Sequence, residues 1–379
     1  MRLKRLIVGL LALLTAVLFS GCGEWGWVRV SPDGQFTTVA RKPPDAPEDS
    51  PEIELAIYHL ERRQTVPVFR FSLDDESPLA GWVYNCQWTP DSRAVCFEWL
   101  RRAADGAPTT DGDSAEATDA KYEHKVMLYE VATGRLQELP IEANAPRWSA
   151  DGKYLMGFSD KGDICLYRTD TWVCTQRVPL PREDYNEIIH WDWAHWVRTE
   201  PPLAVVLLGK KAQSGEGYHQ RHGDLYLLRG AQMIPLTTTG DVQAFWVDPA
   251  GVVVRWVRVQ HLKFLAVFER PLQGGAPRRI ALIPHNETLE ANADPSYTYY
   301  CFSPDGQRLA WDADDSLHVL DLTTATVDTV LARMPQSIRT GVWYELKKAG
   351  ITGFDWRDAE TLLVQRDRIE IHTVHTMER

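Results

Sequence analysis

One stretch of the chain predicts its fold best: Phe302-Ser303-Pro304-Asp305-Gly306-Gln307-Arg308-Leu309-Ala310-Trp311. Pro304 sets φ near about −65°, Asp305 can bond to its own backbone, and Gly306 tolerates a positive φ. Apolar and aromatic residues lie on both sides of this turn with the short period that a hairpin requires. The stretch therefore predicts a strand, a tight turn and a second strand.

Imperfect copies of this turn recur along the chain. They are Ser31–Gly34, Thr89–Ser92, Ser149–Gly152, Asp248–Gly251 and the weaker Arg357–Glu360. The first residues of the six turns are 31, 89, 149, 248, 303 and 357, so the gaps are 58, 60, 99, 55 and 54. The gap of 99 is close to two units, and two apolar segments inside it, 188–193 and 203–208, supply a unit without the motif. We therefore expect seven units.

Each unit also contains a second hairpin. Examples are 126–130, followed by Thr133 and Gly134, and 317–321, followed by Thr323 and Thr324. Two hairpins per unit give four antiparallel strands, and a repeat of this size with four strands is typical of a β-propeller blade. The alternative is a long β-sandwich with a chance enrichment of Pro-Asp-Gly turns.

The pattern aromatic-Ser-Pro-Asp-Gly-x-x-Leu-Ala resembles that of the TolB-type and WD-repeat-like propellers of bacterial envelopes. The resemblance covers nearly all of the chain after its leader, although the α/β domain that precedes the TolB propeller has no counterpart here. It implies a fold rather than a function, because such propellers serve many purposes. The fold class expected is all-β: a seven-bladed β-propeller of four-stranded antiparallel blades over residues 27–379, its last blade three-stranded.

The first residues indicate export. Three basic residues precede an apolar run, Leu6–Phe19, that is too short to span a bilayer as a helix. Residues 1–21 are therefore predicted to be a signal peptide. Ser20-Gly21-Cys22 resembles a bacterial lipobox, in which Cys22 is lipidated and residues 22–26 form a tether, although Phe19 stands where leucine is usual. The alternative is an ordinary signal peptide with a chance cysteine. Because Gly23 replaces the aspartate that retains lipoproteins in the inner membrane of enteric bacteria, the outer membrane is favoured.

The charge argues against a nucleic-acid partner. The whole chain has a net charge of −11, and removal of the leader leaves 38 basic and 52 acidic residues, or −14. Such a balance repels phosphate backbones.

Two cysteine pairs fit an oxidising compartment. Cys86 and Cys96 flank one turn symmetrically, and Cys165 and Cys174 flank another. Residues opposed across a hairpin lie close enough for a disulfide at some positions, so two bridges are predicted. The alternative is four buried free thiols. Cys301 remains single.

The long connections gather on one predicted face. With strands a to d counted outward from the axis, the a–b and c–d turns lie at one end of each blade and the b–c and d–a connections at the other. The long segments 41–51, 103–121, 210–223 and 333–350 all belong to the second end. Long loops usually persist where function needs them, so this loop-rich face is the expected binding face.

Few residues suggest specific chemistry. The chain has no Gly-x-Ser-x-Gly, His-Glu-x-x-His, Cys-x-x-Cys or phosphate-binding glycine loop, and we expect no cofactor and no metal. Two clusters are candidates for binding. An aromatic group that can stack on a sugar or peptide, or simply pack between blades, consists of His190, Trp191, Trp193, His195 and Trp196. A polar group, which is more typical of a solvated loop than of a metal site, contains Tyr218, His219 and His222.

Two functions remain. The favoured one is a noncatalytic, membrane-anchored envelope lipoprotein whose propeller binds a protein or peptide through the loop-rich face. The alternative is an enzyme or carbohydrate-binding propeller that uses an axial pocket. Acidic and histidine residues converging from several innermost strands favour the alternative.

Overall fold

The computed structural model describes residues 28–47, 50–72, 74, 77, 80–102, 122–159, 162–180, 193–209, 223–260, 264–284, 300–313, 316–331, 353–365 and 369–374. The regular elements among these residues are all β-strands, arranged in antiparallel sheets whose strands follow one another in chain order. The sheets belong to two compact units, which are described separately.

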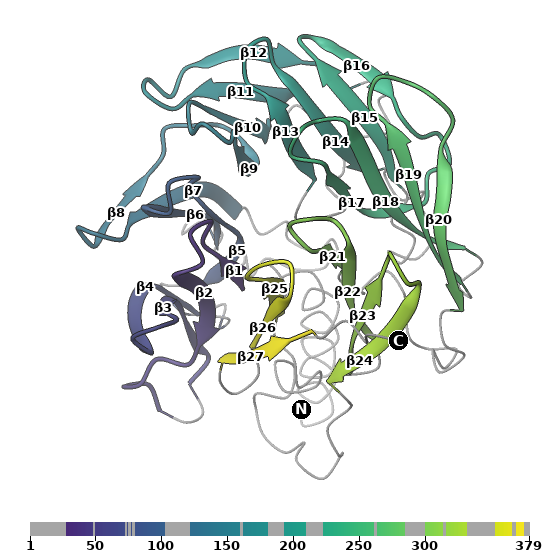
Figure 1. Ribbon diagram of the computed structural model, residues 1–379. Coiled ribbons are helices and arrows are strands. Elements are labelled where there is room, and N and C mark those ends of the chain that lie inside the picture. Colours follow the sequence, from purple (N-terminus) through teal and green to yellow (C-terminus); the bar gives the residue numbers. More distant parts are fainter. Residues whose placement is uncertain are drawn as a thin grey trace, which may run out of the picture. The chain divides into compact units, whose positions relative to one another are not determined.

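The four-sheet unit comprises Trp27–Lys211 and Asp224–Gly240. Its blades 1 and 2 are β1 (Arg29–Val30), β2 (Phe36–Arg41), β3 (Glu52–His59), β4 (Gln64–Ser72), and β5 (Gly81–Trp88), β6 (Ala94–Arg102), β7 (Tyr122–Glu130), β8 (Arg135–Glu138). Its blades 3 and 4 are β9 (Asn144–Trp148), β10 (Tyr154–Phe158), β11 (Ile164–Arg168), β12 (Cys174–Val178), and β13 (Ala194–Arg198), β14 (Leu203–Gly209), β15 (Gly223–Arg229), β16 (Gln232–Pro235). The innermost strands β1, β5, β9 and β13 contact one another in succession (Figure 1).

The three-sheet unit contains the remaining strands, within Asp241–Arg379. They are β17 (Val242–Val247), β18 (Val253–Gln260), β19 (Phe264–Pro271), β20 (Arg278–Pro284), β21 (Tyr300–Phe302), β22 (Arg308–Ala313), β23 (Ser316–Asp321), β24 (Thr326–Leu331), and β25 (Gly353–Trp356), β26 (Thr361–Gln365), β27 (Ile369–Thr373). The first two sheets have four strands, and the last sheet, β25–β27, has three.

The prediction of a seven-bladed propeller is corrected by these sheets. Six of them are complete four-stranded blades, and the final sheet lacks the outer strand that would complete a seventh blade within the described residues. The sheets are also divided between two units rather than forming one described ring. The physical reason is that the turn motif marks the a–b hairpin only, so counting turns counts inner hairpins and not complete, closed blades.

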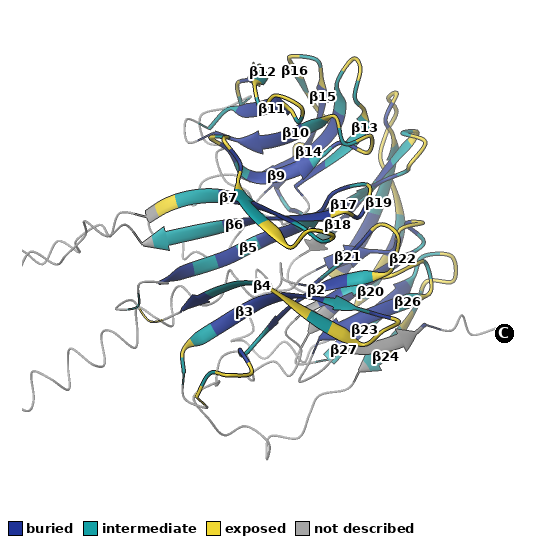
Figure 2. Ribbon diagram, turned by 90° about the vertical axis from the view of Figure 1, so that its left-hand side faces the viewer, coloured by how far each residue is buried: buried dark blue, intermediate teal, exposed yellow. Residues whose placement is uncertain are grey.

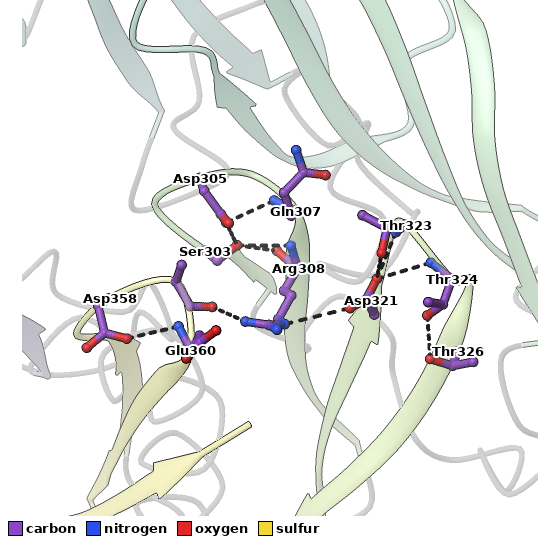
Figure 3. A network of polar contacts seen from close by, with 11 residues as sticks. Ser303, Asp305, Gln307, Arg308, Asp321, Thr323, Thr324, Thr326, Asp358 and Glu360 are labelled. Carbon is purple, nitrogen blue, oxygen red and sulfur yellow. Dashed lines mark hydrogen bonds and ion pairs between the residues drawn. The ribbon is translucent and has the colours of Figure 1, made fainter. Parts of the chain in front are cut away.

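The predicted turn chemistry is present in the structure and repeats between blades. The Ser303 hydroxyl donates to Asp305 Oδ1 at 2.6 Å and accepts from the Arg308 N–H at 2.9 Å, while Asp305 also accepts from the Gln307 N–H (Figure 3). The same hydroxyl–carboxylate bond joins Ser31 to Asp33, Thr89 to Asp91 and Ser149 to Asp151. The a–b turns are therefore short, and their polar groups hydrogen-bond to one another. Few of these groups remain available to bind a ligand.

Tryptophan side chains connect neighbouring blades. Trp88 Nε1 donates to the Arg29 carbonyl at 2.8 Å, and Trp196 Nε1 donates to the Arg147 carbonyl at 3.2 Å. In the three-sheet unit, Trp356 Nε1 donates in the same way to the Cys301 carbonyl at 3.0 Å. Each indole buries a large apolar face while its N–H donates to the innermost strand of the preceding blade. This accounts for part of the high tryptophan content.

Candidate binding surface

The two ends of the blades differ sharply in charge. In blades 1 to 3, the b–c and d–a connections are residues 42–51, 73–80, 103–121, 139–143, 159–163 and 179–193, as fixed by the strand bounds. Together they contain 18 acidic and 4 basic residues, a net charge of −14. The a–b and c–d turns of the same blades contain 5 acidic and 4 basic residues, a net charge of −1. In blades 1 to 3, the b–c and d–a connections are therefore far more acidic than the a–b and c–d turns.

One connection on this face is held by a described ion-pair network. Arg70 donates bidentately to the Asp45 carboxylate, at 2.6 and 3.0 Å, so strand β4 fixes the connection between β2 and β3. Beneath this pair, Glu54 is 1% exposed and accepts from Arg41 Nε at 2.8 Å. The adjacent guanidinium of Arg70 lowers the pKa of Asp45, first through its hydrogen bonds and second through its charge, so Asp45 is ionised at neutral pH.

Blade 2 is longer than blade 3 at the loop-rich face. Strands β5, β6 and β7 extend past the start of β9, as Figure 2 shows, because the Ala145 N–H at the start of β9 bonds Glu98, four residues before the end of β6. Four partly exposed side chains occupy the part of blade 2 that extends beyond blade 3, on the face of the sheet directed toward blade 3. We call them the blade-2 ledge: Trp82, Tyr84, Leu100 and His124.

Strand register places the ledge residues on one face. Trp82 pairs with Leu100 across β5 and β6, and Leu100 pairs with His124 across β6 and β7. Tyr84 lies two residues along β5 from Trp82, and its ring centroid is 5.9 Å from that of His124. The ledge is therefore a row of three aromatic rings and one leucine. Aromatic side chains of this kind are enriched in protein interfaces.

A buried carboxylate lies beneath the ledge. Glu98 is 0% exposed; its Oε1 accepts from the Ala145 N–H at 2.7 Å and lies 2.7 Å from His124 Nε2, and its Oε2 accepts from Asn85 Nδ2. Burial, and second the charge of Glu98, raise the pKa of the Tyr84 phenol, so Tyr84 remains a neutral hydroxyl. Glu98 thus connects blade 2 to blade 3 and lies beside the imidazole of His124.

The side-chain amide of Asn85 is the second buried polar group beneath the ledge. Asn85 is 5% exposed and adopts a positive φ of 53° in the bulge of β5, next to Tyr84. Its Nδ2 is bound to Glu98, while its Oδ1 is buried and accepts no hydrogen bond from the described residues. A buried acceptor without a donor is costly, and it is a natural contact for a donor group that arrives with a ligand.

Three of the binding residues predicted from the sequence are described, and none of them belongs to the ledge. Trp193 is fully buried, its Nε1 donates to the Ala145 carbonyl at 2.7 Å, and its ring lies 4.6 Å from that of Phe158, so it packs between blades 3 and 4. His195 and Trp196 lie in β13 and are partly exposed. The other predicted binding residues, His190, Trp191, Tyr218, His219 and His222, lie outside the described residues, as does Cys22.

The predicted disulfides are not formed. Cys86, Cys96, Cys165 and Cys174 are all free thiols in the structure, as is Cys301. In blade 2 the bulge at Asn85 adds a residue to β5, so Cys96 pairs with Gln87 instead of Cys86.

The second predicted bridge fails for a related reason. In blade 3 the turn between β11 and β12 extends to Val173, so Cys174 pairs with Tyr167, and Cys165 pairs with Arg177. Both pairs of cysteines are symmetrical in sequence but displaced in register.

The ledge itself was missed by sequence reasoning. Its signal was the alternation Trp82-Val83-Tyr84 opposite Glu98-Trp99-Leu100, in which every second residue shares a face. That alternation does not say that blade 3 stops short, so the exposure of the ledge could not be foreseen. Among the described residues, no group of three or more side chains is arranged to hold a metal ion, and no helix there has the length and hydropathy to span a bilayer.

Comparison with known proteins shows a likeness of fold to solved structures. No protein-family model and no curated protein matches the chain. The solved structures include the crystal structure of TolB from Acinetobacter baumannii, which matches with a TM-score of 0.46 and 15% sequence identity. The match covers 78% of this chain and 63% of the TolB chain, so the chain matches less than two thirds of that protein. We take no functional conclusion from this likeness.

Proposed function

We propose that the protein is a cell-envelope lipoprotein, anchored through Cys22, whose blades bind a protein or peptide partner through the loop-rich face. The observation that carries this proposal is the contrast between the two ends of the blades. At one end the turns are short and their polar groups bond to one another. The other end carries the long connections, nearly all the net charge of the connecting segments of blades 1 to 3, and the blade-2 ledge.

The proposed anchor would join the first blade at the same end as the proposed binding face. Strand β1 runs from Arg29 toward the Ser31–Gly34 turn, so it enters its blade from the end that carries the b–c and d–a connections. A lipid on Cys22, with the short tether that follows it, would hold that end near a membrane. The partner is then a protein that is itself in or close to the membrane.

The alternative, an enzyme with an axial pocket, predicted acidic and histidine residues converging from several innermost strands. The polar cluster beneath the ledge does not fit that prediction. Glu98 and His124 come from strands b and c of one blade, and only Asn85 and Tyr84 come from an innermost strand. We therefore prefer binding to catalysis.

The test is capture of a partner from the native membranes of the producing organism. The lipidated protein is crosslinked in place and purified beside a variant in which residues 103–121 are replaced by a short Gly-Ser linker. A second variant, with the 131–134 turn at the opposite end replaced, is the control. We expect a crosslinked partner with the parent chain and the control but not with the 103–121 replacement. Equal capture by all three chains, or none by the parent, would overturn the proposal.

A further inference from the structure

The sheet β17–β20, which we call blade 5, has an open outer edge. Its last strand, β20, pairs with β19 on one side and with no other strand among the described residues (Figure 1). We propose that an extended segment of a partner protein, apolar in its middle and acidic at one end, adds to β20 as a further antiparallel strand. This site is a strand edge and not the loop-rich face, so the proposal goes beyond the proposed function and does not depend on it.

Strand β20 lacks the features that protect most exposed strand edges. A free edge presents unpaired backbone N–H and C=O groups, and proteins discourage its pairing with a proline, a charged residue or a short strand. Of the six fourth strands that the structure describes, five have such a feature: Pro67 in β4, Arg177 in β12, Asp328 in β24, and a length of only four residues in β8 and β16. The middle of β20, residues 280–283, is Ile-Ala-Leu-Ile and contains neither proline nor charge. It is therefore the outer strand best suited to pair with an added strand.

Apolar side chains lie next to this edge on both faces of the sheet. Leu282 of β20 is 43% exposed, and Phe264 at the start of β19 is 38% exposed. The register of the two strands places these side chains on the same face, in diagonal positions. On the opposite face, Ile280 and Ile283 are only partly buried where they pack against the core shared with the next sheet. An added strand would therefore bury apolar side chains on both of its faces.

The start of β20 determines the charge and the direction of the added segment. Arg279 is exposed and forms no ion pair with the described residues, whereas its neighbour Arg278 donates to Glu269 at 3.0 Å. The bulge in β20 leaves Arg279 on the same face as Leu282. A carboxylate that reached Arg279 would form charge-assisted hydrogen bonds with its guanidinium group. Because these arginines begin β20, an antiparallel segment would carry its acidic residues near its own C-terminal end.

A second copy of this chain fits the edge less well. Another β20 would bring two more arginines and no acidic side chain to Arg279. The charge of the whole blade favours the same kind of partner, because residues 241–284 contain six basic and three acidic residues, a net charge of +3 in a chain of net charge −11. A segment with an acidic end complements both the strand and the blade.

The test measures binding of three labelled, amidated peptides to the full-length protein in detergent. The first peptide is Thr-Val-Ile-Val-Thr-Glu-Glu, the second is the same peptide N-methylated at two adjacent central residues, and the third ends in Lys-Lys instead of Glu-Glu. N-methylation of adjacent residues removes backbone donors from both edges of the peptide. We therefore expect the first peptide to bind at least about tenfold more tightly than the second, and more tightly than the third. Equal binding of the first two peptides by fluorescence anisotropy, or no binding of the first, would overturn the proposal.

Substitutions in the chain locate the site. Leu282→Lys puts a charge on the exposed face of β20, and Val327→Lys on the outer strand β24 is the matched control because Val327 is 38% exposed. We expect Leu282→Lys to weaken binding of the first peptide about tenfold and Val327→Lys to change it by no more than about twofold. Circular dichroism confirms that each variant is folded. Equal effects of the two substitutions would contradict the proposal.

The acidic end of the segment has its own test. Arg279→Glu should reverse the preference of the protein, so that the peptide ending in Lys-Lys binds more tightly than the one ending in Glu-Glu. An unchanged preference would contradict the contact assigned to Arg279.

Sedimentation of the protein without peptide distinguishes a partner segment from a second copy. A dimer at micromolar concentration that Leu282→Lys abolishes, with no binding of the first peptide, would overturn the proposal in favour of pairing between two copies of the chain. Failure of this proposal leaves the proposed function intact, because capture of a partner that depends on residues 103–121 tests a different surface.

Strand addition at β20 therefore stands or falls on the backbone donors of the peptide, on Leu282 and on Arg279.

Discussion

At the scale of single residues, Glu98 matters most for the candidate surface. Its fully buried carboxylate receives the Ala145 N–H and the Asn85 amide and lies against His124. These contacts join strands a, b and c of blade 2 to the first strand of blade 3, so one side chain fixes both the ledge and its position. Removing the carboxylate leaves the buried Ala145 N–H and the Asn85 amide unsatisfied, which costs more than the bonds themselves contribute.

We predict that Glu98→Ala lowers the free energy of unfolding by about 3–5 kcal/mol, as expected when two buried hydrogen-bond donors each lose their acceptor. Glu98→Gln keeps an acceptor and the shape of the side chain, so it should cost less. The exposed neighbour Glu123 is the control, and Glu123→Ala should change stability by no more than about 0.5 kcal/mol. Urea unfolding followed by tryptophan fluorescence measures all three. Equal effects of Glu98→Ala and Glu123→Ala would contradict the role assigned to Glu98.

The cysteines give a second prediction at this scale. Burial raises the pKa of the Cys86 thiol to about 12 and that of Cys96 well above its usual range, so neither forms the reactive thiolate at neutral pH. Cys174 is partly exposed, while Cys165 and Cys301 are buried.

In the native Cys22→Ser chain at about pH 8, a thiol reagent should therefore modify Cys174 first and the other four only on unfolding. Mass spectrometry of the alkylated protein identifies the modified residues. Five thiols should react in denaturant without reductant; a count lower by two or four would show that bridges form in the exported protein.

At the scale of elements, the a–b turn shows why glycine recurs at its fourth position. Gly306 has a φ of 65°, which strains any residue with a Cβ, and a Cβ there would lie 2.5 Å from the ring of Trp246 in the neighbouring blade. Gly152 occupies the same turn position in blade 3 with a φ of 71°, but nothing lies within 4 Å of a Cβ built there. A comparison of substitutions at these two glycines therefore distinguishes the cost of backbone strain from the cost of steric overlap with a neighbouring side chain.

We predict that Gly152→Ala costs about 1 kcal/mol of unfolding free energy, from backbone strain alone. Gly306→Ala should cost about 1–3 kcal/mol more, because the added methyl group must displace the Trp246 indole that donates to the Pro304 carbonyl. Thermal or urea unfolding of the two variants gives the difference. Equal losses of stability would mean that the Trp246 contact is easily relaxed.

At the scale of the whole molecule, the proposed anchor at Cys22 would decide which face meets the membrane. A lipid on Cys22 and the four residues 23–26, which lie outside the described residues, would span at most about 15 Å before the first blade begins. Because β1 enters its blade from the loop-rich face, we expect that face to lie close to the bilayer. A membrane-proximal partner fits this orientation.

The prediction at this scale concerns proteolysis of residues 103–121. Protease added to lipid-anchored protein on intact membranes should cut this segment several-fold more slowly than in a soluble Cys22→Ser form exported by a standard signal peptide. The Thr133–Gly134 turn at the opposite end is the internal control and should be equally accessible in both forms. Equal rates of cutting at 103–121 would show that the loop-rich face is open to solvent.

The sequence by itself determined the local features of this protein. Ser303, Asp305 and Gly306 dictate their turn because the hydroxyl, the carboxylate and the missing Cβ act within a few residues. The same is true of the other copies of the turn, and hence of the inner hairpins. The face of each strand also followed from its alternation, as in Trp82, Val83 and Tyr84.

Only the tertiary structure decided what depends on distant contacts. The bulge at Asn85 shifted Cys86 out of line with Cys96, and no pattern in the sequence announces it. The number of complete blades depends on the fourth strand of the last sheet and not on the turn that was counted. The ledge exists because blade 2 extends beyond blade 3, where Ala145 meets Glu98. Packing between segments that are far apart in the chain determines the strand register, the number of strands in a sheet and the relative lengths of strands. No short stretch of the sequence specifies these properties.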